Sequence, residues 1–166
     1  MAEATFKGTP IRTVGDLPAV GSKAPDFSLT DGSLNDVGLS DFAGKKKILS
    51  IVHSLDTGTC VNSAIRFNQE IAKLDGVVLL NISADLPFAA GRVCDSNNLK
   101  NIVTLSNFRS PEFGKDYGVL VVEGAIRGLL ARAIVVLDED DKVLHAQLGP
   151  ELAEEPDYAA TLAALR

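Results

Sequence analysis

The sequence predicts an α/β fold in which helices flank a central mixed β-sheet. Short apolar runs rich in Ile and Val alternate with segments whose apolar residues recur at helical spacing, so strand and helix signals follow one another along the chain. Such alternation is typical of a sheet with helices on both faces. The 166 residues, 46% of them hydrophobic, can bury one sizeable core. We therefore expect residues 1–166 to form a single domain.

The first half of the chain carries a hairpin pattern, two strand patterns and one long helical pattern. Residues 5–6 and 11–12 flank the turn-forming run Lys7-Gly8-Thr9-Pro10, which predicts an N-terminal β-hairpin. Strands are predicted over residues 26–30 and 47–52. The basic residues 45–47 are predicted to lie in a solvated loop, because no phosphate-binding glycine pattern surrounds them. The helical pattern that follows has apolar residues at Val61, Ala64, Ile65, Phe67, Ile71, Ala72 and Leu74.

The second half of the chain begins with a predicted buried strand over residues 77–83. Asp85 is then predicted to be the N-cap of a helix that has Pro87 in its first turn and carries Phe88, Val93, Cys94 and Leu99. The remaining predicted elements are a strand over 102–105, a short helix over 113–117 preceded by the cap Ser110 and by Pro111, strands over 133–137 and 142–148 joined by the acidic turn 138–141, and a closing helix over 156–165. This order suits a thioredoxin-like fold.

Cys60 is distinguished by its position, because it follows a predicted strand and a short polar loop and begins the long helical pattern. In the first turn of a helix, unpaired backbone N–H groups and the positive end of the helix dipole favour an anion. Such a position lowers the pKa of a cysteine, and the thiolate is its nucleophilic form. The sequence therefore predicts sulfur chemistry at Cys60.

Composition excludes several classes of function. The formal net charge of −6 argues against a nucleic-acid surface, which needs clustered Lys and Arg. No apolar run approaches the length that spans a membrane, and the N-terminus shows no secretory-signal pattern. Two cysteines are too few for a structural disulfide framework. We expect a cytoplasmic protein with redox-active thiols, without nucleic-acid or membrane partners.

The run Ser54-Leu55-Asp56-Thr57-Gly58-Thr59-Cys60 resembles the active-site loop of peroxiredoxins, whose usual pattern is Pro-x-x-x-Thr/Ser-x-x-Cys. The whole chain is similar to the bacterial thiol peroxidase branch, an atypical two-cysteine type, with further matching motifs at residues 66–68, 81–89, 92–94, 104–109, 128–133 and 155–158. This resemblance implies an antioxidant enzyme that reduces hydrogen peroxide and organic hydroperoxides. It also implies a homodimer without metal or organic cofactor.

The resemblance assigns a role to each matching residue. Cys60 matches the peroxidatic cysteine, which becomes a sulfenic acid, and Cys94 matches the resolving cysteine, which closes an intrachain disulfide with it. Thr57 matches the hydroxyl that orients thiolate and peroxide, and Arg132 matches the guanidinium that stabilises negative charge. A thioredoxin-type dithiol would then reduce the disulfide. Closing it requires local unwinding if the two cysteines lie on different helices.

Some of these residues also have plainer interpretations. The role of Cys94 follows from the resemblance alone, since an isolated cysteine is usually a small buried hydrophobe. Thr57 by itself is typical of a helix N-cap. Arg132 shares a strand face with apolar residues, and an inward charge there needs a partner. Arg109 could be a second guanidinium near the site or a surface residue.

His53 is a departure from the family, because it stands where the family has a proline, seven residues before Cys60. Proline fixes φ and shields the thiolate with an apolar ring. Histidine adds a titratable group and a backbone donor. Our first interpretation is a volume-conserving substitution in a solvated loop, and the alternative is that His53 tunes the thiolate or its response to pH.

Other classes of function fit the sequence less well than a peroxidase does. A disulfide reductase of the thioredoxin type would need a Cys-x-x-Cys motif, which is absent. A zinc site built from the two cysteines, His53 and His145 has enough ligands but lacks paired ligand spacing. The rival left open is a non-catalytic redox sensor that uses the same sulfenic acid and disulfide without turnover.

Overall fold

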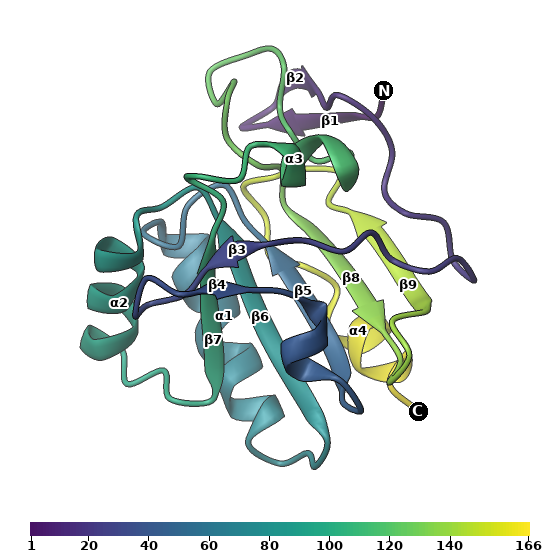
Figure 1. Cartoon of the computed structure of the whole chain (residues 1–166). Helices are drawn as coiled ribbons and strands as arrows, with labels where there is room; N and C mark the ends of the chain where they lie inside the picture. The colour runs from purple at the N-terminus through teal and green to yellow at the C-terminus, as the bar shows by residue number, and fades with distance from the viewer.

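A mixed sheet in the strand order β4-β3-β7-β6-β5-β8-β9 forms the centre of the computed structural model, which describes residues 1–166 (Figure 1). The three central strands are parallel neighbours, β5 (Lys46–Ile51), β6 (Val77–Ser83) and β7 (Ile102–Ser106). Antiparallel strands complete the two edges: β8 (Ala133–Leu137), β9 (Val143–Leu148), β3 (Leu29–Thr30) and β4 (Asp36–Val37). The predicted mixed sheet is confirmed.

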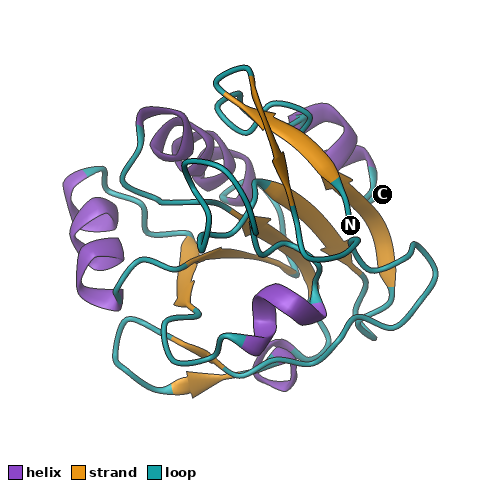
Figure 2. Ribbon diagram, turned by 90° about the horizontal axis from the view of Figure 1, so that it is seen from above, coloured by secondary structure: helices purple, strands orange, loops and turns teal.

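Helices connect the parallel strands, because two parallel neighbours need a crossover segment between them. Helix α1 (Gly58–Ile71) joins β5 to β6, and α2 (Pro87–Ser96) joins β6 to β7. The shorter elements are η1 (Leu39–Phe42), α3 (Glu112–Asp116) and α4 (Tyr158–Ala163). Figure 2 shows helices on both sides of the sheet, as the alternating sequence pattern predicts.

The two faces of the sheet bury two different apolar clusters, because successive side chains of a strand point to opposite faces. On one face, Ile48 and Leu79 pack with Ile134, Val136 and the helix residues Phe67 and Ile71 of α1. On the other face, residues such as Leu49, Ile51 and Val135 pack beneath Phe113 and Tyr117 from the region of α3. Helix α1 therefore packs on the sheet face that carries Ile48 and Leu79, and the N-terminus of α1 lies beyond the end of β5.

The N-terminal hairpin pairs β1 (Glu3–Phe6) with β2 (Thr9–Arg12) and lies at the top of Figure 1. Its turn consists of Lys7 and Gly8, whose φ values of 51° and 81° both lie in the left-handed region. Two such residues make the hairpin turn whose twist matches that of the strands. The predicted hairpin is thus confirmed, with a shorter turn than the expected run Lys7-Gly8-Thr9-Pro10.

Three local predictions need correction. The strand expected over residues 26–30 is reduced to Leu29–Thr30, because Asp26 instead accepts hydrogen bonds from the N–H groups of Phe27 and Leu39 in a turn. The N-cap of α2 is Leu86 and not Asp85, and α2 ends before Leu99. Ser110 does not cap α3, because its hydroxyl donates to the carbonyl of Ser28.

Lys47 corrects the prediction of a solvated basic loop. Its side chain lies within β5 and is 0% exposed, and its Nζ lies 2.5 Å from the carboxylate of Asp141 in the β8–β9 turn. A buried ammonium requires such a partner, since desolvation of an unpaired charge is very unfavourable. One residue of the basic run, Lys47, therefore forms a structural ion pair at the start of β5.

Candidate active site

Cys60 lies in the first turn of α1 and is completely buried. The N-cap of this helix is Thr57, whose Oγ1 accepts a hydrogen bond of 3.3 Å from the backbone N–H of Cys60. The remaining backbone N–H groups of the first turn point toward the same end of the helix. The predicted positions of Cys60 and Thr57 are therefore confirmed, and the capping interaction uses the Thr57 side chain.

Arg132 meets Cys60 across the fold. Its Nη2 lies 2.9 Å from Cys60 Sγ, and its Nε donates to the carbonyl of Leu152 at 3.0 Å. The side chain is 2% exposed and its Nη1 has no hydrogen-bond partner. Because Arg132 precedes β8 on the face of Ile134 and Val136, it points to the α1 side of the sheet. The partner that an inward charge requires is thus the sulfur of Cys60.

The pKa of Cys60 is lowered from its ordinary value of 9.0 to about 7. Burial by itself raises the pKa of this thiol, because it disfavours the charged form. The interaction with His53, the positive charge of Arg132 and the hydroxyl of Thr57 outweigh that effect. Of the polar contacts to Sγ, the one with Arg132 is the shorter, at 2.9 Å against 3.9 Å for His53. A large share of the thiol is therefore ionised near neutral pH.

His53 is buried next to Cys60. Its Nε2 lies 3.9 Å from Cys60 Sγ and its side chain is 5% exposed. The ring of Phe6, from the N-terminal hairpin, packs edge-on against the imidazole with centroids 5.5 Å apart. The expectation that His53 lies in a solvated loop is therefore wrong, because the hairpin covers this loop.

Asp85 anchors the loop that carries the site. Its carboxylate accepts hydrogen bonds from the hydroxyls of Ser54 and Ser83, each at 2.8 Å, and from the backbone N–H of Leu55 at 2.7 Å. Asp85 directly precedes the start of α2, so one carboxylate joins the Cys60 loop to the Cys94 helix. Sequence reasoning assigned Asp85 to an N-cap, because partners about 30 residues away are invisible in local spacing.

Residues 151–153 form a second support that sequence reasoning missed. Within it, the carbonyl of Leu152 accepts from Arg132, and the carbonyl of Ala153 accepts from the hydroxyl of Thr59 at 2.8 Å. The Glu151 carboxylate accepts from the Thr5 hydroxyl and from backbone N–H groups of the hairpin turn. The backbone carbonyls of this segment have no signature in the amino-acid sequence.

Cys94 lies on α2 and is half-buried, and both cysteines are free thiols. Burial raises the pKa of the Cys94 thiol, and the charge of Asp95 adds to the effect. Cys94 packs against the apolar cluster between α1 and α2, which also contacts Val61 next to Cys60. Beside it a groove of about 390 Å³ is lined by Asp56, Val61, Leu86, Phe88, Ala89, Arg92, Val93, Ser96 and Asn97.

The structure does not bring Arg109 to a site with Cys60. The Arg109 guanidinium is exposed and binds the carboxylate of Asp36 at 2.8 Å and the carbonyl of Leu34 at 2.9 Å. It therefore has the surface role that was one of its two interpretations. No group of three or more His, Cys, Asp or Glu side chains is arranged to hold a metal ion. None of the helices combines the length and the apolar character needed to cross a membrane.

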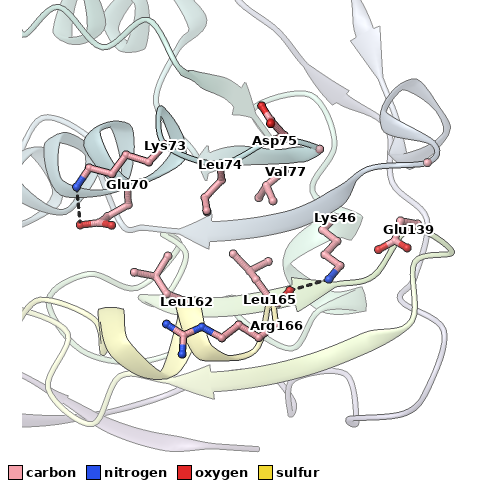
Figure 3. A pocket seen from close by; sticks show the side chains of 12 residues that line it. Lys46, Glu70, Lys73, Leu74, Asp75, Val77, Glu139, Leu162, Leu165 and Arg166 are labelled. Carbon is pink, nitrogen blue, oxygen red and sulfur yellow. Dashed lines mark hydrogen bonds and ion pairs between the residues drawn. The ribbon is translucent and has the colours of Figure 1, made fainter.

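A cavity of about 580 Å³ lies at the other end of the central strands (Figure 3). It is lined by Lys46 at the start of β5, Val77 at the start of β6 and residues near the C-terminus, including Leu162 and Leu165. The Lys46 ammonium donates to the Leu165 carbonyl at 2.6 Å. Since Cys60 follows the end of β5, this cavity is separate from the thiol site.

The chain is similar to known proteins over most or all of its length. The model of the Redoxin family matches residues 19–162. A thiol peroxidase of Staphylococcus aureus (strain MRSA252) is 49% identical over 166 residues, which cover all of this chain and 99% of that protein. A peroxiredoxin-like protein from Aquifex aeolicus is similar in structure, with a TM-score of 0.92, 36% identity, and coverage of 99% of this chain and 96% of that one. A thiol peroxidase from Chromobacterium violaceum has a similar fold, with a TM-score of 0.91, 24% identity, and coverage of 98% and 94%.

Proposed function

Because this chain belongs to the Redoxin family and is a thiol-dependent peroxidase, we propose that Cys60 is its peroxidatic cysteine and that hydroperoxides are its substrates. The observation that carries this proposal is the contact of 2.9 Å between Cys60 Sγ and Arg132 Nη2 at the N-terminus of α1. A buried thiol beside a guanidinium and a helix N-terminus is poised as a thiolate, the form that attacks peroxides.

In the first step, the Cys60 thiolate attacks the terminal oxygen of the hydroperoxide. An S–O bond forms as the O–O bond breaks, the sulfur is oxidised by two electrons to a sulfenic acid, and the departing oxygen takes a proton and leaves as water or an alcohol. Arg132 stabilises the thiolate and the negative charge that develops on the departing oxygen. Thr57 holds the helix start with its hydroxyl and orients the reacting groups.

In the second step, the thiolate of Cys94 attacks the sulfenic sulfur of Cys60, an S–S bond forms as the S–O bond breaks, and the departing hydroxide takes up a proton from solvent and leaves as water. The product is an intrachain disulfide, which a thioredoxin-type dithiol reduces back to two thiols. Cys60 is buried in the first turn of α1 and Cys94 lies on α2. Local unwinding of these helices brings the two sulfurs to bonding distance.

The groove beside α2 supports the inclusion of organic hydroperoxides among the substrates. Phe88, one of the residues that line it, is 70% exposed, and Val61 contributes to the groove from α1. Apolar side chains there would receive the alkyl part of such a molecule. We further propose a cytoplasmic homodimer that serves in antioxidant defence, as the resemblance to bacterial thiol peroxidases implies.

Replacement of each cysteine tests the proposal. Cys60→Ser should abolish peroxide consumption, whereas Cys94→Ser should consume about one equivalent per chain and accumulate sulfenic acid. In the unmodified protein, peroxide should produce a monomer of altered mobility on non-reducing electrophoresis. A covalent dimer as the main product would contradict the intrachain disulfide. A disulfide that forms without turnover in the presence of thioredoxin and its reductase would instead identify a redox sensor.

A further inference from the structure

The position and burial of His53 point to a role for this residue in proton transfer. Its Nε2 is directed at Cys60 Sγ at 3.9 Å, and its Nδ1 is buried without a hydrogen-bond partner. The side chain is 5% exposed and its ring is covered by Phe6. A buried polar ring without another partner interacts with the one reactive group beside it, which is the thiol.

The difference from the family proline lies in the imidazole and not in the backbone. The backbone N–H of His53 takes part in no hydrogen bond, so a proline in its place would leave no backbone donor missing. What His53 adds to this site is an imidazole, whose ring nitrogens can accept and release a proton.

We propose that His53 is the proton acceptor of the Cys60 thiol, an inference that rests on the proposed peroxidatic role of Cys60. The neutral imidazole carries its hydrogen on Nδ1 and takes the thiol proton on Nε2, which gives a thiolate and an imidazolium with no change in net charge. After the thiolate has attacked, the departing oxygen leaves with the proton from Nε2. His53 is then neutral again, and thiol plus hydroperoxide has become sulfenic acid plus water or an alcohol.

The charges around His53 determine how this proton transfer responds to pH. Arg132 favours the thiolate at every pH used, because a guanidinium stays protonated. Lys7 lies against the Phe6 ring, with its Nζ 5.5 Å from the ring centroid, and the Glu151 carboxylate is bound to the hairpin backbone. On the loop side, Asp85 is occupied by Ser54 and Leu55. His53 and Arg132 are therefore the two side chains whose nitrogen atoms face the Cys60 sulfur directly.

The interaction between His53 and Cys60 predicts the direction in which the loss of His53 shifts the pH dependence of the thiolate. When His53 is protonated, the imidazolium favours the ionised form of the neighbouring sulfur, so the thiolate persists to a lower pH than it would beside a neutral residue. Without His53, the thiolate should be lost at a higher pH as the solution is acidified. An opposite charge at this range of distance lowers the pKa of its partner by about 1 unit or more, which sets the size of the expected shift.

The test measures the ultraviolet absorbance of the thiolate and the second-order rate of oxidation against pH. Both are recorded in a Cys94→Ser background, where Cys60 is the only thiol of the chain. His53→Gln and His53→Pro should shift the low-pH part of both curves (the acid limb) to higher pH by about 1 unit. His145→Gln, which changes the other histidine, is the matched control and should leave the limb in place. Superimposable curves for the two His53 variants and the parent protein would overturn the inference.

A second measurement observes the histidine itself. The NMR titration of the His53 ring should move to lower pH in Cys60→Ser, because the thiolate that stabilises the imidazolium is gone, whereas the His145 titration should not move. An unchanged His53 titration would also overturn the inference. These outcomes are separable from the proposed peroxidatic role of Cys60, which fails if Cys60→Ser still consumes peroxide.

Discussion

Arg132 and Cys60 are 72 residues apart in the chain, yet the Arg132 guanidinium donates to the Cys60 sulfur at 2.9 Å in the buried interior. The start of β8 supplies the guanidinium and the start of α1 supplies the thiol. Parallel pairing of β5 with β6 and antiparallel pairing of β5 with β8 bring these two points together, because Ile51 at the end of β5 is paired with Ala133. The sheet register therefore determines the electrostatics of the site.

Arg132→Met should slow the oxidation of Cys60 by about 10²–10³-fold, the usual effect of removing one well-placed donor to a developing negative charge. It should also raise the pKa of Cys60, since a positive charge beside the thiolate is lost. Stopped-flow oxidation kinetics and a thiolate titration measure the two effects. Arg132→Lys keeps the positive charge, but an ammonium group cannot contact the Cys60 sulfur and the Leu152 carbonyl at the same time as the planar guanidinium does. This variant should therefore recover only part of the oxidation rate.

Thr57→Val should weaken both the helix start and the site, because the acceptor for the Cys60 N–H is removed while the shape is kept. Loss of such an N-cap costs about 0.5–2 kcal/mol of unfolding free energy, measured by denaturant titration. Thr57→Ser retains the oxygen and should behave like the parent protein in stability and oxidation rate. Equal stability of the Val and Ser variants would contradict the capping role.

Asp85→Ala should destabilise the protein by about 1–3 kcal/mol, since three donors of the loop and of β6 lose their acceptor. The loop that places Cys60 should also become less ordered, and the oxidation rate should fall. Asp85→Asn keeps one acceptor oxygen and should lie between Ala and the parent protein. An oxidation rate that is unaffected in Asp85→Ala would show that the loop holds its position without this carboxylate.

Glu151 should contribute a component of acid sensitivity. Hydrogen bonds, first from the Thr5 hydroxyl and then from backbone N–H groups, lower its pKa from 4.5 to about 2. Because the folded-state pKa is lowered, its stabilisation is present above pH 4.5 and is lost as the pH falls toward 2. The unfolding free energy of Glu151→Gln should therefore fall less than that of the parent protein across this range. Glu154→Gln changes a neighbouring exposed residue, and its unfolding free energy should fall with pH as steeply as that of the parent protein.

Asp141→Asn should reduce the unfolding free energy by about 3–5 kcal/mol, because it leaves the ammonium of Lys47 buried without a counter-charge. Asp141 has a φ of 67°, a conformation that asparagine also adopts, so the backbone of the turn is preserved. The oxidation rate of Cys60 at low temperature should be unchanged, since this pair lies at the start of β5. A loss of stability well below this range would show that solvent reaches Lys47 after the exchange.

The sequence by itself determined most of the elements and the position of Cys60 at a helix start. The β6 pattern over 77–83 and the β8 pattern over 133–137 match the observed strands to the residue, because each is a short apolar run of the kind that forms a buried strand. Cys60 was located at a helix start because the change from such a run to helical periodicity falls just before it. These properties depend on neighbours along the chain, which local spacing records.

Only the tertiary structure decided which polar groups meet. Lys47 is buried against Asp141, Asp85 binds Ser54 and Leu55 and does not cap α2, and the hairpin that carries Phe6 buries His53. Each of these outcomes depends on a partner brought from far along the chain by sheet register and loop packing. These partners decide whether a titratable residue is solvated or buried, and whether it is charged or neutral. Periodicity contains no information about such partners, because it reports only which face of its own helix or strand a side chain occupies.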